Sequence, residues 1–203
     1  MPGADAKTIA HYNRTADEYV ARTRDADLGE IRCRFLSLVK PGGRILDVGS
    51  GSGRDLKAFR QQGFVPIGIE PSAALAERAR KYSGETCVVR DVESLTWRDE
   101  FDGIWACASL LHLPKASLPN ALQRLSEALR PGGVLYVSVR SGEGERRLPD
   151  GRYFADYTEA ELRKLVASVP SLQSPIVWAS PDSSPHRQDV EWISLLALRK
   201  GAD

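Results

Sequence analysis

The chain has 203 residues, with 28 basic and 27 acidic side chains, so its formal net charge is +1. That balance gives no overall field favouring nucleic acid or a membrane surface. Cys33, Cys87 and Cys107 are widely spaced, and no Cys/His cluster accompanies them. We therefore expect neither a disulfide framework nor a metal site. The start of the chain has no signal-peptide pattern, and no apolar run approaches about 18 residues. These features predict one cytoplasmic domain over residues 1–203.

The first expected element is a helix over residues 6–21. Tyr12 and Tyr19 lie seven positions apart in it, which places them on one face of the helix. Both can be half-buried packing residues. A second amphipathic helix covers residues 28–39 and ends at a Pro-Gly-Gly break.

An apolar strand follows and ends in an acid, Asp47, before three glycines at alternate positions, Gly49, Gly51 and Gly53. A helical pattern begins directly afterwards, which predicts a strand, a tight turn and a helix N-terminus. Glycines suit such a turn because they allow positive φ and leave the backbone open to a ligand. Free N–H groups at a helix start can hold a carboxylate or a phosphate. We interpret this segment as a nucleotide-type cofactor site; a glycine turn without a ligand is the alternative.

The next two strands each end in an acid. Residues 65–69 are followed by Glu70, and an acid at that place in a strand–glycine–helix–strand site accepts hydrogen bonds from ribose hydroxyls. Its other possible role, capping the following helix, suits Ser72 better. Residues 86–90 are followed by Asp91, which can accept a hydrogen bond from the exocyclic amine of adenine or can be a solvated loop acid.

The second half of the chain continues the alternation of strands and helices. A fourth strand, residues 101–107, ends in small residues before His112, and Ser117 is the expected cap of a leucine-striped helix. A fifth strand covers residues 134–139. Such an alternation predicts parallel strands with right-handed crossovers.

The C-terminal part begins with a long polar connection over residues 141–157, and long ordered loops are often functional. Thr158 and Glu161 form a capping box for the next helix. Residues 175–179 and 190–198 are expected to form a final antiparallel pair of strands.

Three segments resemble those of class I S-adenosylmethionine (SAM)-dependent methyltransferases. Asp47 with its three alternate glycines resembles motif I, in which Arg54 stands where the dinucleotide fingerprint has its third glycine. Residues 101–112 resemble motif IV of the small-molecule branch, and the [DNS]-P-P-[YFW] motif of nucleic-acid amino-methyltransferases is absent there. The pattern Tyr12, Ala16, Tyr19 resembles the lid helix that precedes motif I. The resemblance covers residues 8–140 and is greatest to tellurite-resistance-type and ubiquinone-biosynthesis-type enzymes.

The resemblance implies a Rossmann-like, doubly wound α/β fold with a seven-stranded, mostly parallel sheet and an antiparallel last strand. Residues 1–40 would form lid helices, residues 41–140 the cofactor-binding core, and residues 141–203 the substrate-side loop, helix and final hairpin. The implied reaction is methyl transfer from SAM to a small molecule, which leaves S-adenosylhomocysteine (SAH). Asp47 and the glycine turn would hold the methionine part, Glu70 the ribose, and Asp91 with Val92 the adenine. The expected cofactor-binding residues are Tyr12, Tyr19, Asp47, Gly49, Ser50, Gly51, Gly53, Glu70, Pro71, Asp91, Val92, Cys107 and Ala108.

The acceptor is expected outside the carboxyl ends of the strands, where ligands of open parallel sheets bind. His112 is the candidate general base, because histidine titrates near neutrality, and Tyr19 is a second catalytic candidate. His112 can instead only orient the substrate or cap a turn. The expected substrate-binding residues are His112, Arg140, Tyr153 and Arg187.

Several arginines near this edge indicate an anionic acceptor, since guanidinium groups bind oxyanions in a bidentate manner. They are Arg140, Arg146, Arg147, Arg152 and Arg187. The alternative is a solvated surface neutralised by neighbouring glutamates.

Other functions remain open. An NAD-dependent enzyme is disfavoured by Arg54 and by the absence of a Tyr-x-x-x-Lys pair. A non-catalytic SAM-binding interaction module would keep the same motifs. RNA methylation is weakened by the neutral charge. We expect a small-molecule partner, no nucleic acid or membrane partner, and a monomer or homodimer.

Overall fold

The computed structural model describes residues 5–182 and 189–201. Three helices come first, α1 (Ala6–Arg14), α2 (Ala16–Thr23) and α3 (Gly29–Leu36). The central part alternates β1 (Arg44–Val48), α4 (Arg54–Gln61), β2 (Val65–Ile69), α5 (Ala73–Ser83), β3 (Cys87–Val88), β4 (Phe101–Cys107), α6 (Leu118–Ala128) and β5 (Leu129–Arg140). The last part contains β6 (Glu145–Arg147), β7 (Tyr153–Ala155), α7 (Glu159–Ala167), β8 (Ile176–Pro181) and β9 (Glu191–Leu198).

The main sheet has seven strands in the order β3-β2-β1-β4-β5-β9-β8. The first five of these are parallel, and β9 is antiparallel to both β5 and β8. The predicted mostly parallel, doubly wound α/β sheet with an antiparallel last strand is confirmed. Its carboxyl edge therefore gathers the ends of β1, β2, β4 and β5.

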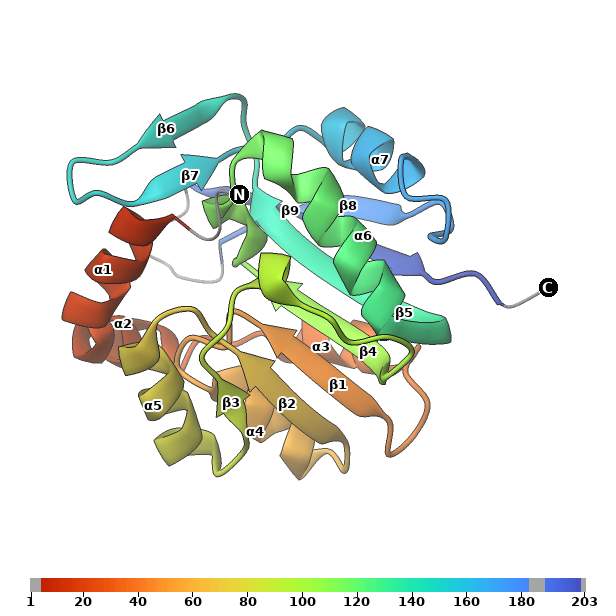
Figure 1. The fold of residues 1–203 in the computed structure, drawn as a ribbon, viewed down its shortest axis with the longest axis horizontal. Coiled ribbons are helices and arrows are strands. Elements are labelled where there is room, and N and C mark those ends of the chain that lie inside the picture. The colour runs from red at the N-terminus through yellow and green to blue at the C-terminus, as the bar shows by residue number, and fades with distance from the viewer. Residues whose placement is uncertain (1–4, 183–188, 202–203) are drawn as a thin grey trace.

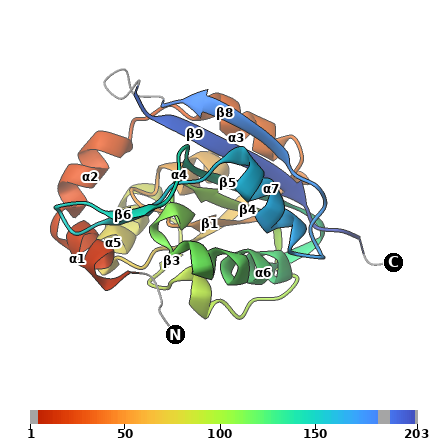
Figure 2. The ribbon, with the colours of Figure 1, turned by 90° about the horizontal axis from the view of Figure 1, so that it is seen from above.

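Helices cover both faces of this sheet (Figures 1 and 2). Alternate residues of β1 point to opposite faces, so Leu46 packs in the cluster that includes α6 and α7, whereas Ile45 packs in the cluster of α3 and α4. The segments α1, α2 and the hairpin of β6 and β7 lie together at one edge of the sheet, on the left of Figure 1. No helix in the described part of the chain is long and apolar enough to span a bilayer.

Some element boundaries differ from the prediction. The single helix expected over residues 6–21 is two helices, because Thr15 leaves the helical conformation with φ −111° and ψ 22°. Strand β3 is only two residues long. Ser117 occupies the N-cap position of α6 but makes no capping hydrogen bond with its side chain. The capping box of Thr158 and Glu161 is confirmed.

The polar connection over residues 141–157 is not only a loop. It contains the antiparallel hairpin β6–β7, in which Glu145 pairs with Ala155 and Arg147 with Tyr153. Three-residue strands are too short for a two-residue hydrophobic period to be read from sequence. The hairpin lies beside α1 (Figure 1), which places it next to the carboxyl edge of the sheet.

Candidate functional site

The turn after β1 approaches neighbouring groups more closely than side chains would allow. Gly49 and Gly51 have φ of +75° and +52°. A Cβ on Gly49 would lie 2.5 Å from Cβ of Ser109, and a Cβ on Gly51 would lie 3.0 Å from Oη of Tyr19. Glycine is therefore required at both positions, because the turn contacts the loop after β4 on one side and helix α2 on the other.

Glu70 joins this turn to the end of β2. Its carboxylate accepts hydrogen bonds from the N–H groups of Gly51 (3.0 Å) and Ser72 (2.9 Å). Burial raises the pKa of Glu70 to about 7, although these two hydrogen bonds act in the opposite direction. Ser72 also caps α5, as expected, by accepting from the N–H of Leu75.

Asp47 is buried beneath the turn. Burial, and then the nearby carboxylate of Asp55, raise its pKa well above the usual value. Its Oδ2 has no hydrogen-bond partner among the described residues. A buried carboxylate oxygen without a donor is costly, so a cationic or N–H-bearing ligand at this place would stabilise it.

Three of the expected cofactor residues have other contacts in the structure. A Cβ on Gly53 would lie 2.7 Å from the backbone of Ala79, so this glycine allows α4 and α5 to pack. Ser50 donates its hydroxyl to the carbonyl of Asp47 and lies over Gly68. Burial raises the pKa of Cys107 to about 12, and Ser138 donates to its sulfur at 3.6 Å.

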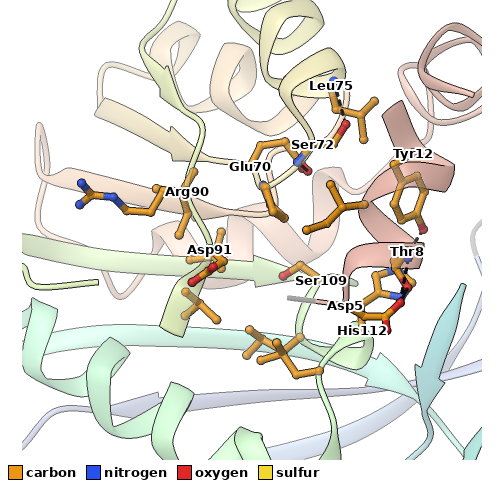
Figure 3. Close-up of a pocket in the computed structure, with 18 of the residues that line it drawn as sticks. Asp5, Thr8, Tyr12, Glu70, Ser72, Leu75, Arg90, Asp91, Ser109 and His112 are labelled. Atoms are coloured by element: carbon orange, nitrogen blue, oxygen red, sulfur yellow. Dashed lines mark hydrogen bonds between the residues drawn. The ribbon is translucent and has the colours of Figure 1, made fainter. Parts of the chain in front are cut away.

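A cavity opens beside the turn, at the carboxyl edge of the sheet (Figure 3). The expected residues that line it are Tyr12, Tyr19, Gly49, Glu70, Pro71, Asp91, Val92, Ala108 and His112. Asp47, Ser50, Gly51, Gly53 and Cys107 lie behind or beside this wall and do not line the cavity. Asp91 lies on one side and Tyr12 with His112 on the other (Figure 3). The cavity is thus lined by residues at or after the ends of four strands, β1, β2, β3 and β4.

His112 is held from both sides. Its Nδ1 lies 2.7 Å from the carbonyl oxygen of Tyr153, and its Nε2 lies 2.9 Å from the hydroxyl of Tyr12. Burial lowers the pKa of His112 to about 4, so the ring is neutral at neutral pH. A carbonyl only accepts, so Nδ1 carries the proton and Nε2 accepts from Tyr12.

Aromatic side chains form a row from the glycine turn to the hairpin. Tyr12 of α1 and Tyr19 of α2 meet edge-on with ring centroids 5.2 Å apart, so the two rings lie together although they are not on one face of a single helix. Tyr12 and His112 are 5.4 Å apart, and His112 and Phe154 of β7 are 4.7 Å apart. This aromatic row therefore links α2, α1, the loop after β4 and the hairpin.

The sequence reasoning missed several lining residues. Asp5, Thr8 and Ile9 lie one or two helical turns before Tyr12 and therefore on the same face of α1. Their spacing from Tyr12 was the signal that could have identified them. Ser109 carries a buried hydroxyl without a partner among the described residues, and Ala108 before it has φ +52°. No local pattern marks Ser109. The remaining missed residues are Val48, Ile69, Ser72, Leu75, Arg90, Leu110 and Leu113.

Most of the expected anion-binding arginines are already paired. Arg146 bonds to Asp156, Arg147 to Asp5, and Arg152 to Asp150. Arg140 forms no ion pair among the described residues, and its Nε is buried without a partner. Its guanidinium carbon lies 5.8 Å from the ring centroid of Phe154. Within the described residues, Arg140 is therefore a cation without an ion-pair partner, close to Phe154 at the hairpin end of the aromatic row.

Two expected substrate residues are not part of this arrangement. The hydroxyl of Tyr153 donates to Glu145, so the side chain is bonded outside the cavity and only the Tyr153 carbonyl reaches His112. Arg187 and the neighbouring His186 lie outside the described residues.

The chain is similar in sequence to several known methyltransferases. A sequence profile of the family described as "Methyltransferase domain" matches residues 20–172. An uncharacterized methyltransferase of Geobacillus thermodenitrificans is 29% identical over 127 residues, which cover 61% of this chain and 59% of that protein. A malonyl-[acyl-carrier protein] O-methyltransferase of Enterobacter lignolyticus is 30% identical over 153 residues, which cover 70% of this chain and 57% of that protein. The chain spans about three fifths of the length of these curated relatives.

A solved structure extends the likeness to the whole fold. The Burkholderia thailandensis 1,6-didemethyltoxoflavin-N1-methyltransferase, with bound 1,6-didemethyltoxoflavin and SAH, has a TM-score of 0.71 to this chain at 22% identity. The match covers 98% of this chain and 92% of that one. Because the family profile matches more than half of the sequence, the chain belongs to the methyltransferase-domain family.

Proposed function

We propose that the chain transfers the methyl group of SAM to a small anionic acceptor. The observation that carries the cofactor assignment is the unpartnered, buried Oδ2 of Asp47 beneath the glycine turn. SAM carries an ammonium group that would donate to this oxygen, and its positive sulfonium supplies an already activated methyl. The remaining tasks of the protein are to align the acceptor with the methyl group and to exclude water.

The other cofactor contacts follow the cavity wall. Glu70 would take the ribose hydroxyls, since a buried carboxylate with a raised pKa gains from further donors. Asp91 and Val92 would meet the adenine, although one oxygen of Asp91 already accepts from the N–H of Ser94 at 2.8 Å. Tyr12 and Tyr19 would cover the methionine end.

His112 would act on the acceptor from the opposite wall. The free lone pair of the ring is on Nε2, where it accepts a hydrogen bond from the hydroxyl of Tyr12 in this structure. A proton leaving the acceptor would pass to Tyr12 while Tyr12 passes its own proton to Nε2, or would reach Nε2 directly once Tyr12 moves. Burial keeps His112 unprotonated but makes it a weak base, which suits an acceptor that becomes acidic as the methyl is transferred.

The anionic character of the acceptor is supported by Arg140. A buried guanidinium nitrogen without a partner is stabilised by an oxyanion, and the Arg140 guanidinium and the His112 ring both lie near the ring of Phe154. The names of relatives include one small acceptor, 1,6-didemethyltoxoflavin, and one acceptor that is borne by a protein, malonyl-[acyl-carrier protein].

The setting of the reaction is also a proposal. The three cysteines are free, which supports a reducing cytoplasm. With a net charge of +1, the chain is expected to act on small molecules rather than on nucleic acid, as a monomer or homodimer.

Calorimetric titration with SAM, SAH and NAD tests the cofactor assignment. We expect micromolar binding of SAM or SAH and none of NAD.

Gly51→Ala should abolish this binding, because the new Cβ would block the backbone where Tyr19 already lies at 3.0 Å. Gly84→Ala is the matched control, since Gly84 has φ +75° but open space around it. It imposes a similar backbone strain of about 1 kcal/mol without touching the site. Absence of binding by both SAM and SAH would contradict the proposal.

A further inference from the structure

Arg54 joins the lid helix α2 to the glycine turn. It is the first residue of α4, directly after Gly53. Its Nε and Nη2 donate to Oδ1 and Oδ2 of Asp55 at 3.2 and 2.7 Å. Its Nη1 donates to the carbonyl of Thr23, the last residue of α2, at 3.1 Å. One guanidinium therefore holds the C-terminal end of α2 against the helix that follows the turn.

Asp55 fixes the orientation of this guanidinium. The carboxylate is 6% exposed and also accepts from Nη1 of Arg32 at 2.8 Å and from Nε1 of Trp105 at 3.2 Å. Burial opposes ionisation of Asp55, but Arg54 and Arg32 outweigh it and lower the pKa of the carboxyl. Asp55 is thus an ionised anchor shared by α3, α4 and β4, and Arg54 has little freedom to turn away.

The position of α2 decides whether the glycine turn is covered. Tyr19 lies one helical turn before Thr23, whose hydroxyl donates to the Tyr19 carbonyl at 2.8 Å. The Cε1 and Oη atoms of Tyr19 each lie 3.0 Å from the place a Cβ on Gly51 would take. A ligand on that side of Gly51 can enter or leave only if the ring of Tyr19, which α2 carries, moves away.

We infer that Arg54 is a positioning residue that holds helix α2 over the glycine turn and so slows the entry and release of the cofactor. The inference rests on the proposed cofactor site. It does not require Arg54 to touch the cofactor, since the residue acts through the carbonyl of Thr23 and through Tyr19. A cation is also favourable at a helix C-terminus, where the carbonyl dipoles converge.

Three arginine substitutions separate this role from general support of the fold. Arg54→Gln removes both the charge and the bond to α2. Arg32→Gln is the matched control, because Arg32 also bonds to Asp55 but has no hydrogen bond to α2 in the described structure. Arg54→Lys keeps the charge, although a single ammonium cannot bond to Asp55 and Thr23 with the same geometry.

The readouts are the dissociation rate of SAH, followed by rapid displacement, and amide hydrogen exchange of residues 16–23 without cofactor. For Arg54→Gln we expect about tenfold faster SAH dissociation and loss of exchange protection in α2, the range expected for one charge-assisted hydrogen bond. Arg54→Lys should be intermediate. Arg32→Gln should lower the melting temperature at least as much, yet leave both readouts within about twofold of the parent chain.

Equal acceleration of SAH release by Arg54→Gln and Arg32→Gln would overturn the inference, because both would then act only through fold stability. Unchanged exchange in α2 of Arg54→Gln would also overturn it. If the parent chain binds neither SAM nor SAH, the proposed function fails on that result. The exchange experiment on the free protein still decides whether Arg54 holds α2.

Discussion

Burial shifts the pKa values of two groups that line the cavity, His112 and Glu70, in opposite directions. It lowers the pKa of His112 to about 4 and raises that of Glu70 to about 7. In both cases the neutral form is favoured, because a low-dielectric surrounding penalises charge. The cofactor proposed here would supply donors to Glu70, so its binding should be strengthened by ionisation of that carboxyl.

The stability of the chain should depend on pH through His112. The unfolded histidine binds a proton below its usual pKa of 6.5, whereas the folded one does so only near 4. Between these values the unfolded state binds more protons, so the free energy of unfolding falls as pH falls from 6.5 to 4. The full effect is about 3 kcal/mol at most.

Urea denaturation at several pH values checks this prediction, with His112→Asn as the comparison. The difference in unfolding free energy between the two proteins should grow with pH over this window and stay constant above it. Glu70 contributes with the opposite sign but is present in both proteins and cancels. Parallel curves would show that His112 is not kept neutral by the fold.

Arg140 should determine acceptor affinity without affecting the cofactor. Arg140→Gln is expected to raise the KM of acceptors that carry a carboxylate or phosphate by roughly tenfold to a hundredfold, the value of a charge-assisted bond. The measurement compares matched acceptors with and without the anionic group, together with SAH binding. Arg163→Gln removes the same charge from α7, where the side chain is 49% exposed, and should change nothing. An equal KM increase for the neutral acceptors would remove Arg140 from anion binding.

At the scale of elements, the hairpin β6–β7 fastens α1 over the cavity. Asp5 caps α1 by accepting from the N–H of Thr8 at 2.8 Å, and the same carboxylate binds both terminal nitrogens of Arg147 at 2.9 Å. The hydroxyl of Thr8 in turn accepts from the N–H of Tyr153 at 2.9 Å. These contacts between α1 and the hairpin also hold Tyr12, on the same helix, in reach of His112.

Asp5→Ala should therefore destabilise α1 more than loss of its ion-pair partner Arg147 does. Loss of the cap is expected to cost about 1 kcal/mol of unfolding free energy and to expose residues 6–14 to hydrogen exchange. Arg147→Gln keeps the cap and breaks only a partly exposed ion pair, which contributes at most about 1 kcal/mol. Exchange measured by mass spectrometry over α1 compares the two variants. Identical exchange in both would mean that the ion pair, not the cap, holds this helix.

At the scale of the whole molecule, the site lies where the strand order reverses. The chain builds the sheet outward from β1 through β2 and β3, then returns to add β4 and β5 on the other side. The loops after β1 and β4 diverge from this point, and open α/β sheets bind ligands in that crevice. Gly49 and Ser109, which belong to these two loops, approach each other closely at this crevice.

Local rules were sufficient for much of this arrangement. Alternate glycines after Asp47 predicted a turn with positive φ, because only glycine adopts it without cost. Glu70 and Asp91 were found because parallel strands end at one edge, and Ser72 because a serine before a helix caps it. The hairpin β6–β7 was not found, since its strands are too short to show a period.

The sequence by itself determined the strand and helix alternation, the glycine turn and the set of acids at the strand ends, because these depend on backbone conformation and on periods within one segment. Only the tertiary structure decided which side chains meet. Tyr12 bonds to His112 and Arg54 to Thr23, and Gly53 proved to allow α5 to pack. Contacts of this kind join elements that are far apart in the chain. They depend on how buried surfaces fit together, which no local pattern records.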